Sequence, residues 1–237
     1  MFLSLRTGEE RLVHPALQQF SRPRYAADGK SVAVHGVALD GVQGIYQIDR
    51  QSGASLLLAR ADGEELANPV WTAGGKTLFF ERGGNSVWMQ DRDSRKQIRS
   101  YKSAARNANF NSAPSSDGQI VAIVEGGSLL VVRTGERSRE ILRLTPPEIF
   151  NPFPGSLAWT ADGRYILFGK VVERERQVWR IPAAGGRAEP IGLSVQNEAL
   201  YFLRTSADGR GIAFVIGDCD LRPQEVWSME NFFADIR

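Results

Sequence analysis

The sequence predicts an all-β fold built from repeated four-stranded antiparallel sheets, and two observations lead to it. A ten-residue pattern, clearest as WTADGRYILF from Trp159 to Phe168, occurs in five copies along the chain. The copies align on one glycine, at Gly29, Gly75, Gly118, Gly163 and Gly209, with spacings of 46, 43, 45 and 46 residues. A spacing in the forties is typical of repeat proteins in which each repeat forms one small sheet.

Each copy reads as a turn followed by a buried strand. An aspartate precedes the glycine in four copies (Asp28, Asp117, Asp162 and Asp208), and Gly74 takes its place in the other. Asp-Gly favours a two-residue hairpin turn in which the aspartate caps its own backbone, so we interpret these aspartates as structural. The residues three, four and five places after the glycine are apolar in every copy, as in Ile166 to Phe168. A strand that is apolar on both faces is expected between two neighbouring sheets.

Taken in order, the chain opens in the middle of a repeat, with a strand at Phe2 to Leu5 and a second at Arg11 to His14. The first full repeat has strands near Arg24 to Ala26, Ser31 to His35, Ile45 to Asp49 and Ser55 to Ala59. The third strands of later repeats are expected at Val87 to Gln90, Ser128 to Val132, Gln177 to Ile181 and Glu225 to Met229. Glu230 to Arg237 offers no fourth strand, so the sequence predicts 21 strands.

These repeats predict a single β-propeller domain over residues 1–237, with five or six blades. The half-repeat covers 1–14, and the repeats cover about 20–60, 66–101, 109–145, 154–193 and 200–233. Five blades result if Glu10 to His14 completes the last blade beside Val226 to Met229, but the strand at Phe2 to Leu5 is then an unpaired edge. We therefore favour the C-terminal part of a larger protein with further blades.

The repeat also resembles a known family. An aromatic residue, Ser or Thr, any residue, Asp-Gly-Lys/Arg and an apolar triplet, followed by a strand such as GIYQIDRQSG, resembles the WD-like repeat of TolB-type proteins and of prolyl-oligopeptidase-like propellers. Ala26, Gly74, Pro114 and Thr205 depart from that pattern. The tail EVWSMENFF is similar to propeller ends in bacterial multidomain regulators. The resemblance implies the fold and leaves the function open.

Composition narrows the function classes. The net charge is +2, so no general affinity for nucleic acid is expected, and no stretch approaches the 18 apolar residues that membrane insertion requires. Met1 to Arg11 lacks the apolar core of a signal peptide, which predicts a cytoplasmic protein as given, or a periplasmic one if a segment precedes it. The lone Cys219 excludes an internal disulfide, and we expect a monomer.

No motif for catalysis, a cofactor or a metal is present. His14 and His35 share no ligand spacing with Cys219, and there is no Gly-x-Ser-x-Gly motif. Gly75-Lys76-Thr77 lacks the upstream glycine of a phosphate loop, and Asp218-Cys219-Asp220 with Glu225 fits no calcium loop. We therefore predict a protein that is not an enzyme, with no catalytic residue, cofactor or metal.

Tryptophans and basic residues have structural interpretations. All five tryptophans, Trp71, Trp88, Trp159, Trp179 and Trp227, occupy repeat positions, which predicts packing between blades rather than a ligand cage. The basic residues between Arg92 and Arg106 cross a strand, so their side chains alternate between its faces. We interpret this run as a solvated outer edge.

The candidate binding face lies seven residues before the aligned glycine. The residues there are Arg22, Asn68, Asn111, Ser156 and Phe202, which are mostly polar and differ between repeats. First strands of propeller blades line a central channel, so these positions predict a protein or peptide partner at one channel mouth. The alternatives are the gating propeller of a serine peptidase that lacks its hydrolase domain, and a propeller enzyme with a channel active site.

Overall fold

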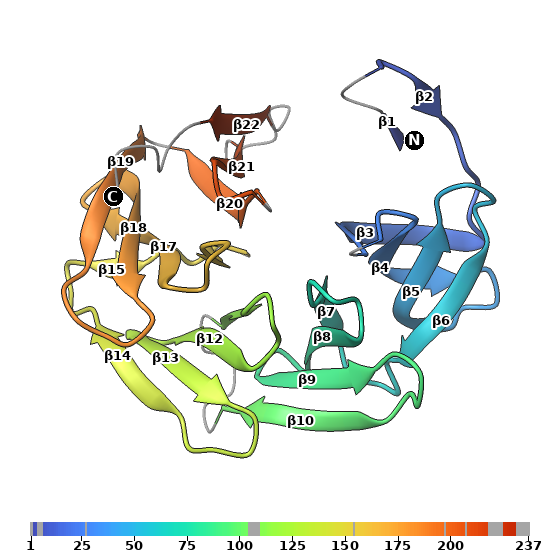
Figure 1. Cartoon of the computed structure of the whole chain (residues 1–237), viewed down its shortest axis with the longest axis horizontal. Coiled ribbons are helices and arrows are strands. Elements are labelled where there is room, and N and C mark those ends of the chain that lie inside the picture. The colour runs from blue at the N-terminus through green and yellow to red at the C-terminus, as the bar shows by residue number, and fades with distance from the viewer. Residues whose placement is uncertain are drawn as a thin grey trace. The chain divides into compact units, whose positions relative to one another are not determined.

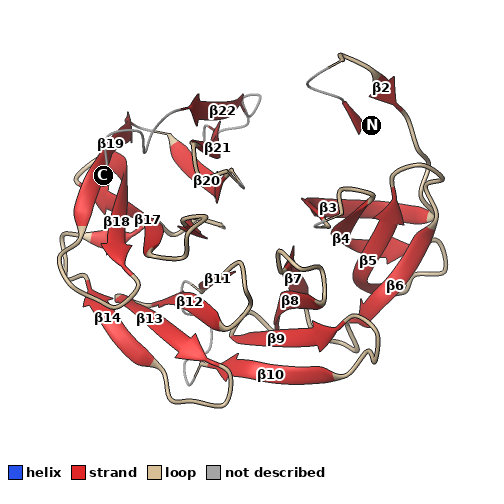
Figure 2. Cartoon of the chain, viewed as in Figure 1, coloured by secondary structure: helices blue, strands red, loops and turns tan. Residues whose placement is uncertain are grey.

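A computed structural model of the chain describes residues 7–26, 28–103, 110–153, 155–196, 198–206 and 208–217, and the backbone alone at 2–3 and 225–230. Every regular element in these ranges is a β-strand (Figure 2). Within them, no helix has the length and apolar character of a membrane span. The all-β prediction is therefore confirmed.

The described strands belong to two compact units, residues 1–104 and 105–237. In the first unit, β1 (Phe2–Leu3) pairs with β2 (Glu10–Arg11) (Figure 1). An antiparallel sheet of β3 (Leu17–Tyr25), β4 (Ser31–Ala38), β5 (Gln43–Asp49) and β6 (Ser55–Arg60) follows. The next sheet consists of β7 (Leu66–Trp71), β8 (Thr77–Arg82), β9 (Ser86–Asp91) and β10 (Gln97–Lys102).

The second unit contains three more sheets. The first is β11 (Asn111–Pro114), β12 (Ile120–Glu125), β13 (Ser128–Arg133) and β14 (Arg139–Arg143). The second is β15 (Ile149–Phe150), β16 (Leu157–Trp159), β17 (Tyr165–Val172), β18 (Glu175–Pro182) and β19 (Glu189–Gln196). The third is β20 (Ala199–Thr205), β21 (Gly211–Gly217) and β22 (Glu225–Glu230).

Three sequence predictions need correction or lie outside the description. The strand expected at Arg11 to His14 is Glu10–Arg11, paired with Phe2–Leu3. The described residues form 22 strands rather than 21, because the first strand of the fourth repeat is divided into β15 and β16. Leu5, Arg106, the Asp218 to Asp220 loop with Cys219, the Trp227 side chain and the tail after Glu230 lie outside the described residues. The single-domain boundaries and the closure of the ring stay predictions.

The five hairpin turns share one geometry. In each, the amide of the aligned glycine donates to the carbonyl oxygen three residues earlier, as from Gly163 to Thr160 at 2.9 Å. All five glycines have left-handed backbones, with φ between 64° and 71°. The aspartates before them do not, so the turn is longer than the predicted two-residue type, in which both residues have positive φ. The carboxylate of each aspartate instead accepts the amide two residues later, as Asp162 accepts that of Arg164 at 3.0 Å.

The second strand of the fourth repeat is buried by a neighbouring sheet on each of its faces. On β17, Ile166 and Phe168 pack in the cluster that contains Val124 and Leu129 of the preceding sheet. Leu167, between them, packs in the cluster that contains Leu200 and other residues of the following sheet. None of the three is more than 1% exposed. The apolar triplet therefore fills both faces of its strand, as the sequence predicts.

Polar contacts also join neighbouring sheets. Trp159 Nε1 donates to the Ala113 carbonyl oxygen at 2.8 Å, and Thr205 Oγ1 donates to the Trp159 carbonyl oxygen at 2.7 Å. These two donors occupy the same repeat position in successive sheets. In the second unit, this position thus contributes hydrogen bonds between sheets as well as apolar contacts.

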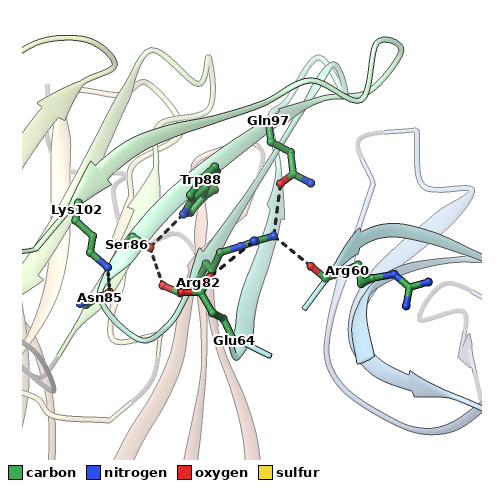
Figure 3. A network of polar contacts seen from close by, with 8 residues as sticks. All are labelled: Arg60, Glu64, Arg82, Asn85, Ser86, Trp88, Gln97 and Lys102. Carbon is green, nitrogen blue, oxygen red and sulfur yellow. Dashed lines mark hydrogen bonds and ion pairs between the residues drawn. The ribbon is translucent and has the colours of Figure 1, made fainter. Parts of the chain in front are cut away.

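Arg82, at the end of β8, ties the second sheet to the first (Figure 3). Its Nη2 donates to the Arg60 carbonyl oxygen at 3.2 Å, its Nη1 lies 3.7 Å from Glu64 Oε2, and its guanidinium covers the Trp88 ring at 5.1 Å. Lys170 stands at the same repeat position in the second unit, 4.0 Å over the Trp179 ring and 2.7 Å from Glu148. Trp88 and Trp179 therefore stack against cations of the chain itself, which agrees with a packing role.

The turn geometry predicts different effects of substitution at the aligned glycine and at the residue directly before it. A Cβ at Gly163 would meet no atom within 4 Å, so Gly163→Val is penalised only by its φ of 68°. We expect a loss of about 1–3 kcal/mol in the free energy of unfolding. Gly74 has no left-handed backbone, so Gly74→Asp should stabilise by up to about 1 kcal/mol, because the new carboxylate can accept the Lys76 amide. Urea unfolding of both variants checks this, and equal shifts would contradict the turn assignment.

Candidate functional site

Three of the five candidate positions share a feature of the backbone. Arg22, Asn68 and Phe202 have left-handed φ angles of 55°, 49° and 51°. Each begins a β-bulge. Ser21 pairs with His35 and Arg24 with Ala33, which leaves Arg22 and Pro23 opposite Val34, and β7 and β20 have equivalent shifts. A bulge turns a side chain away from the regular alternation of the strand, and strain of this kind is common at binding sites.

In the first unit, Arg22 and Asn68 have different surroundings. The Arg22 charge acts on His35, whose pKa is lowered by burial and by Arg22 and raised in smaller part by Glu65. Burial, together with the Arg22 charge, also lowers the pKa of Arg24 to about 10. Asn68 Nδ2 donates to Oε2 of the buried Glu81 at 2.7 Å, so its amide is engaged within the fold. Asn68 is thus a structural residue as well as a candidate contact.

In the second unit, an excursion of the chain from Asn151 to Ser156 separates β15 from β16. Gly169 on β17 bridges its two ends: the Asn151 amide donates to the Gly169 carbonyl oxygen and the Gly169 amide to that of Ser156, at 2.8 and 2.9 Å. A Cβ at Gly169 would lie 2.7 Å from the Asn151 Cβ, so a glycine is required there. This excursion is the reason that the fourth repeat has two first strands.

The excursion contacts the sheets on both sides of its own. Asn111 Oδ1 accepts the Gly155 amide at 2.8 Å, which links it to the preceding sheet. Asn151 Nδ2 donates to the Leu200 carbonyl oxygen at 2.7 Å, which links it to the following sheet. Ser156 Oγ donates to the Asn151 carbonyl oxygen at 3.0 Å. Asn111 and Ser156 are buried, so these two candidates support the excursion rather than contact a partner directly.

Phe202 belongs to a partly exposed aromatic group beside the excursion. The rings of Phe153 and Tyr201 are 4.8 Å apart, those of Tyr201 and Phe202 are 6.0 Å apart, and the Arg176 guanidinium lies 5.3 Å from the Phe153 ring. We call these four residues the ledge. Aromatic rings with an adjacent arginine are the side chains that most often dominate binding energy at protein interfaces. The sequence indicates Phe202 alone, because the other three come from the excursion and from other strand positions.

Two buried polar atoms around the ledge have no partner among the described residues, namely Oδ1 of Asn151 and Nε of Arg176. A buried polar atom without a hydrogen bond costs about 1–3 kcal/mol. Both atoms are covered by the protein itself, so they are not contact points for a ligand.

The remaining sequence candidates are dispersed. Within the described residues, no three or more His, Cys, Asp or Glu side chains are grouped to hold a metal ion. In the basic run, Arg92 covers the Trp71 ring at 5.8 Å and Lys102 Nζ donates to Asn85 Oδ1 at 2.8 Å. These two cations have structural contacts.

Comparison with known proteins identifies solved structures that have a similar fold. No protein-family model and no curated protein sequence matches the chain. A TolB from Agrobacterium tumefaciens is similar in structure, with a TM-score of 0.67 and 14% identity over 90% of this chain and 78% of that one. An oligogalacturonate lyase in complex with manganese has a TM-score of 0.58 and 13% identity over 93% and 76%. A structure from a study of two prolyl endopeptidases has a TM-score of 0.58 and 17% identity over 90% and 34%.

These similarities show that the chain has a β-propeller fold of the TolB-like kind, as the sequence predicts. At these identities they establish the fold alone, and the same fold carries both binding proteins and enzymes. The function therefore depends on the residues of the site rather than on the fold.

The bulge geometry separates two candidate positions in a stability test. Asn68→Ala removes the hydrogen bond to buried Glu81 and places alanine at a φ of 49°, so we expect a loss of about 1–3 kcal/mol in the free energy of unfolding. Arg22→Asn is the matched control, because asparagine accepts a left-handed backbone and the change removes a charge that opposes protonation of His35. Chemical denaturation should leave Arg22→Asn unchanged or slightly stabilised; an equal loss in both variants would argue against the role of Asn68.

Proposed function

We propose that the chain is a non-catalytic binding module that recognises a protein or peptide partner, and that the ledge is the centre of the contact surface. The supporting observation is the group Phe153, Tyr201, Phe202 and Arg176, which is partly exposed and is held in place from three sheets. Rigid aromatic rings give a large contact area for little loss of side-chain entropy.

The ledge favours a peptide ligand. Arg176 is partly exposed beside the rings, and its guanidinium can donate hydrogen bonds to a carbonyl oxygen of a peptide. The rings then hold an apolar side chain or proline of the same peptide. Asn111 and Ser156 contribute by fixing the excursion that carries Phe153.

The proposal is tested with peptides selected from a displayed random library on the purified chain. Affinities of the synthesised peptides are then measured by calorimetry for the wild type, Tyr201→Ser, Arg176→Gln and the control Tyr25→Ser, which removes an exposed tyrosine from the first unit. We expect the affinity for the peptide to fall by about tenfold or more in the two ledge variants, since removing an anchor side chain costs upwards of about 1.4 kcal/mol. The control should bind as the wild type does.

Equal binding by all four proteins, or no enriched peptide, would contradict a peptide-binding ledge. The competing enzymatic function is assessed on the same preparation with oligogalacturonate and with peptide substrates. Turnover that Arg176→Gln or Tyr201→Ser abolishes would replace the binding module with a propeller enzyme.

A further inference from the structure

A second site is indicated in the first unit, far along the sequence from the ledge. A cavity of about 470 Å³ is lined by Glu9 and Arg11 of the N-terminal hairpin, by the turn residues Gly29 and Lys30, and by Asp49 to Gln51 after β5. A water molecule occupies about 30 Å³ in the liquid, so this cavity can hold a ligand of many atoms. Three separate segments of the chain supply its walls.

The lining carries an excess of positive charge. Arg11, Lys30 and Arg50 face two acids, Glu9 and Asp49. Asp49 is committed to its own turn, because its Oδ1 accepts the amides of Gln51 and Ser52 and the hydroxyl of Ser52 at 2.7 to 2.9 Å. The hydrogen bonds from Ser52 hold the pKa of Asp49 below its ordinary value, so it stays charged but engaged. Glu9 is exposed and, among the lining residues that the structure describes, is the one acid that is left to oppose the three cations.

One of the cations is held in position. Arg50 Nη1 donates to the Gly29 carbonyl oxygen at 2.7 Å, and its guanidinium lies 5.3 Å from the Tyr25 ring. A guanidinium fixed in this way loses little side-chain entropy when an anion binds beside it. Arg11 and Lys30 are exposed, and neither forms an ion pair with any residue that the structure describes.

A cavity beside the turns of the second unit gives an internal comparison. It measures about 270 Å³, and its lining includes Asp162, Arg164, Arg180 and Asp208. Arg164 Nε donates to Asp162 and Arg180 Nε to Glu189, each at 2.7 Å. Burial raises the pKa of Asp162, but hydrogen bonds from Thr160 and Arg164 outweigh it and lower the pKa to about 2. In this cavity Arg164 and Arg180 each pair with an acidic side chain, whereas Arg11 and Lys30 form no ion pair with a described residue.

We propose that the cavity of the first unit binds a small, multiply charged oxyanion whose anionic oxygens belong to phosphate or carboxylate groups. Arg50 supplies a fixed positive charge for one such group, and Arg11 and Lys30 supply exposed charges from the hairpin and the turn for the others. A ligand with several anionic oxygens can contact all three cations at once, which a monovalent ion cannot.

The test uses inorganic phosphate and citrate as probes, with calorimetry and thermal unfolding at constant ionic strength set by sodium chloride. The wild type is compared with Arg11→Gln/Lys30→Gln and with the control Arg99→Gln/Arg187→Gln, which removes the same charge from exposed positions outside both cavities. We expect one or both probes to bind and to raise the melting temperature, with a loss of affinity of about tenfold or more in the cavity variant alone.

Binding of phosphate alone would indicate a phosphate ligand, and binding of citrate alone would indicate a polycarboxylate. Binding of both would show that the site recognises anionic oxygens of either group. If neither phosphate nor citrate binds, the proposed site is wrong. An equal loss of affinity in the control variant would also contradict it. Because the ledge belongs to the other unit, its peptide test succeeds or fails independently of this one.

Discussion

The structure depends on the burial of second strands, which β17 shows most completely because it lies between two sheets. Ile166 and Phe168 contribute to one cluster and Leu167 to another, and a fully buried side chain of this size contributes about 1.5–3 kcal/mol. An isolated repeat would leave both faces of this strand in water. Stability therefore arises from the contact of sheets, and the hydrogen bonds of Trp159 and Thr205 to neighbouring strands fix how the sheets meet.

The same constraint determines where the repeats can differ. The turn glycines and second strands are held to one geometry by their φ angles and their burial, whereas the first strands vary in backbone as well as in side chain. β3, β7 and β20 have bulges, β11 pairs regularly and the fourth repeat has the excursion at Asn151 to Ser156. The proposed peptide site lies where this variation is greatest.

Sequence reasoning succeeded where the cause is local. The positive φ of Gly163 and the apolar triplet after it are properties of a few adjacent residues, so the period of the sequence located turns and strands in every repeat. It could not find contacts between distant residues, such as Asn111 with Gly155 or Asn151 with Leu200, which are 44 and 49 positions apart. The ledge and the cationic cavity are both assembled from such distant segments. Asn68 shows the converse, since its place in the repeat was visible but its bond to Glu81 was not.

Hydrogen exchange measured by mass spectrometry tests the central claim most directly, namely that the second strands β4, β8, β12 and β17 are the buried centres of their sheets. Amides of β8, β12 and β17 should exchange slowest and at similar rates, because they are paired on both edges and covered on both faces. Amides of the exposed turn from Arg92 to Lys96 should exchange rapidly. Exchange in Ile166 to Phe168 as fast as in that turn would contradict the account.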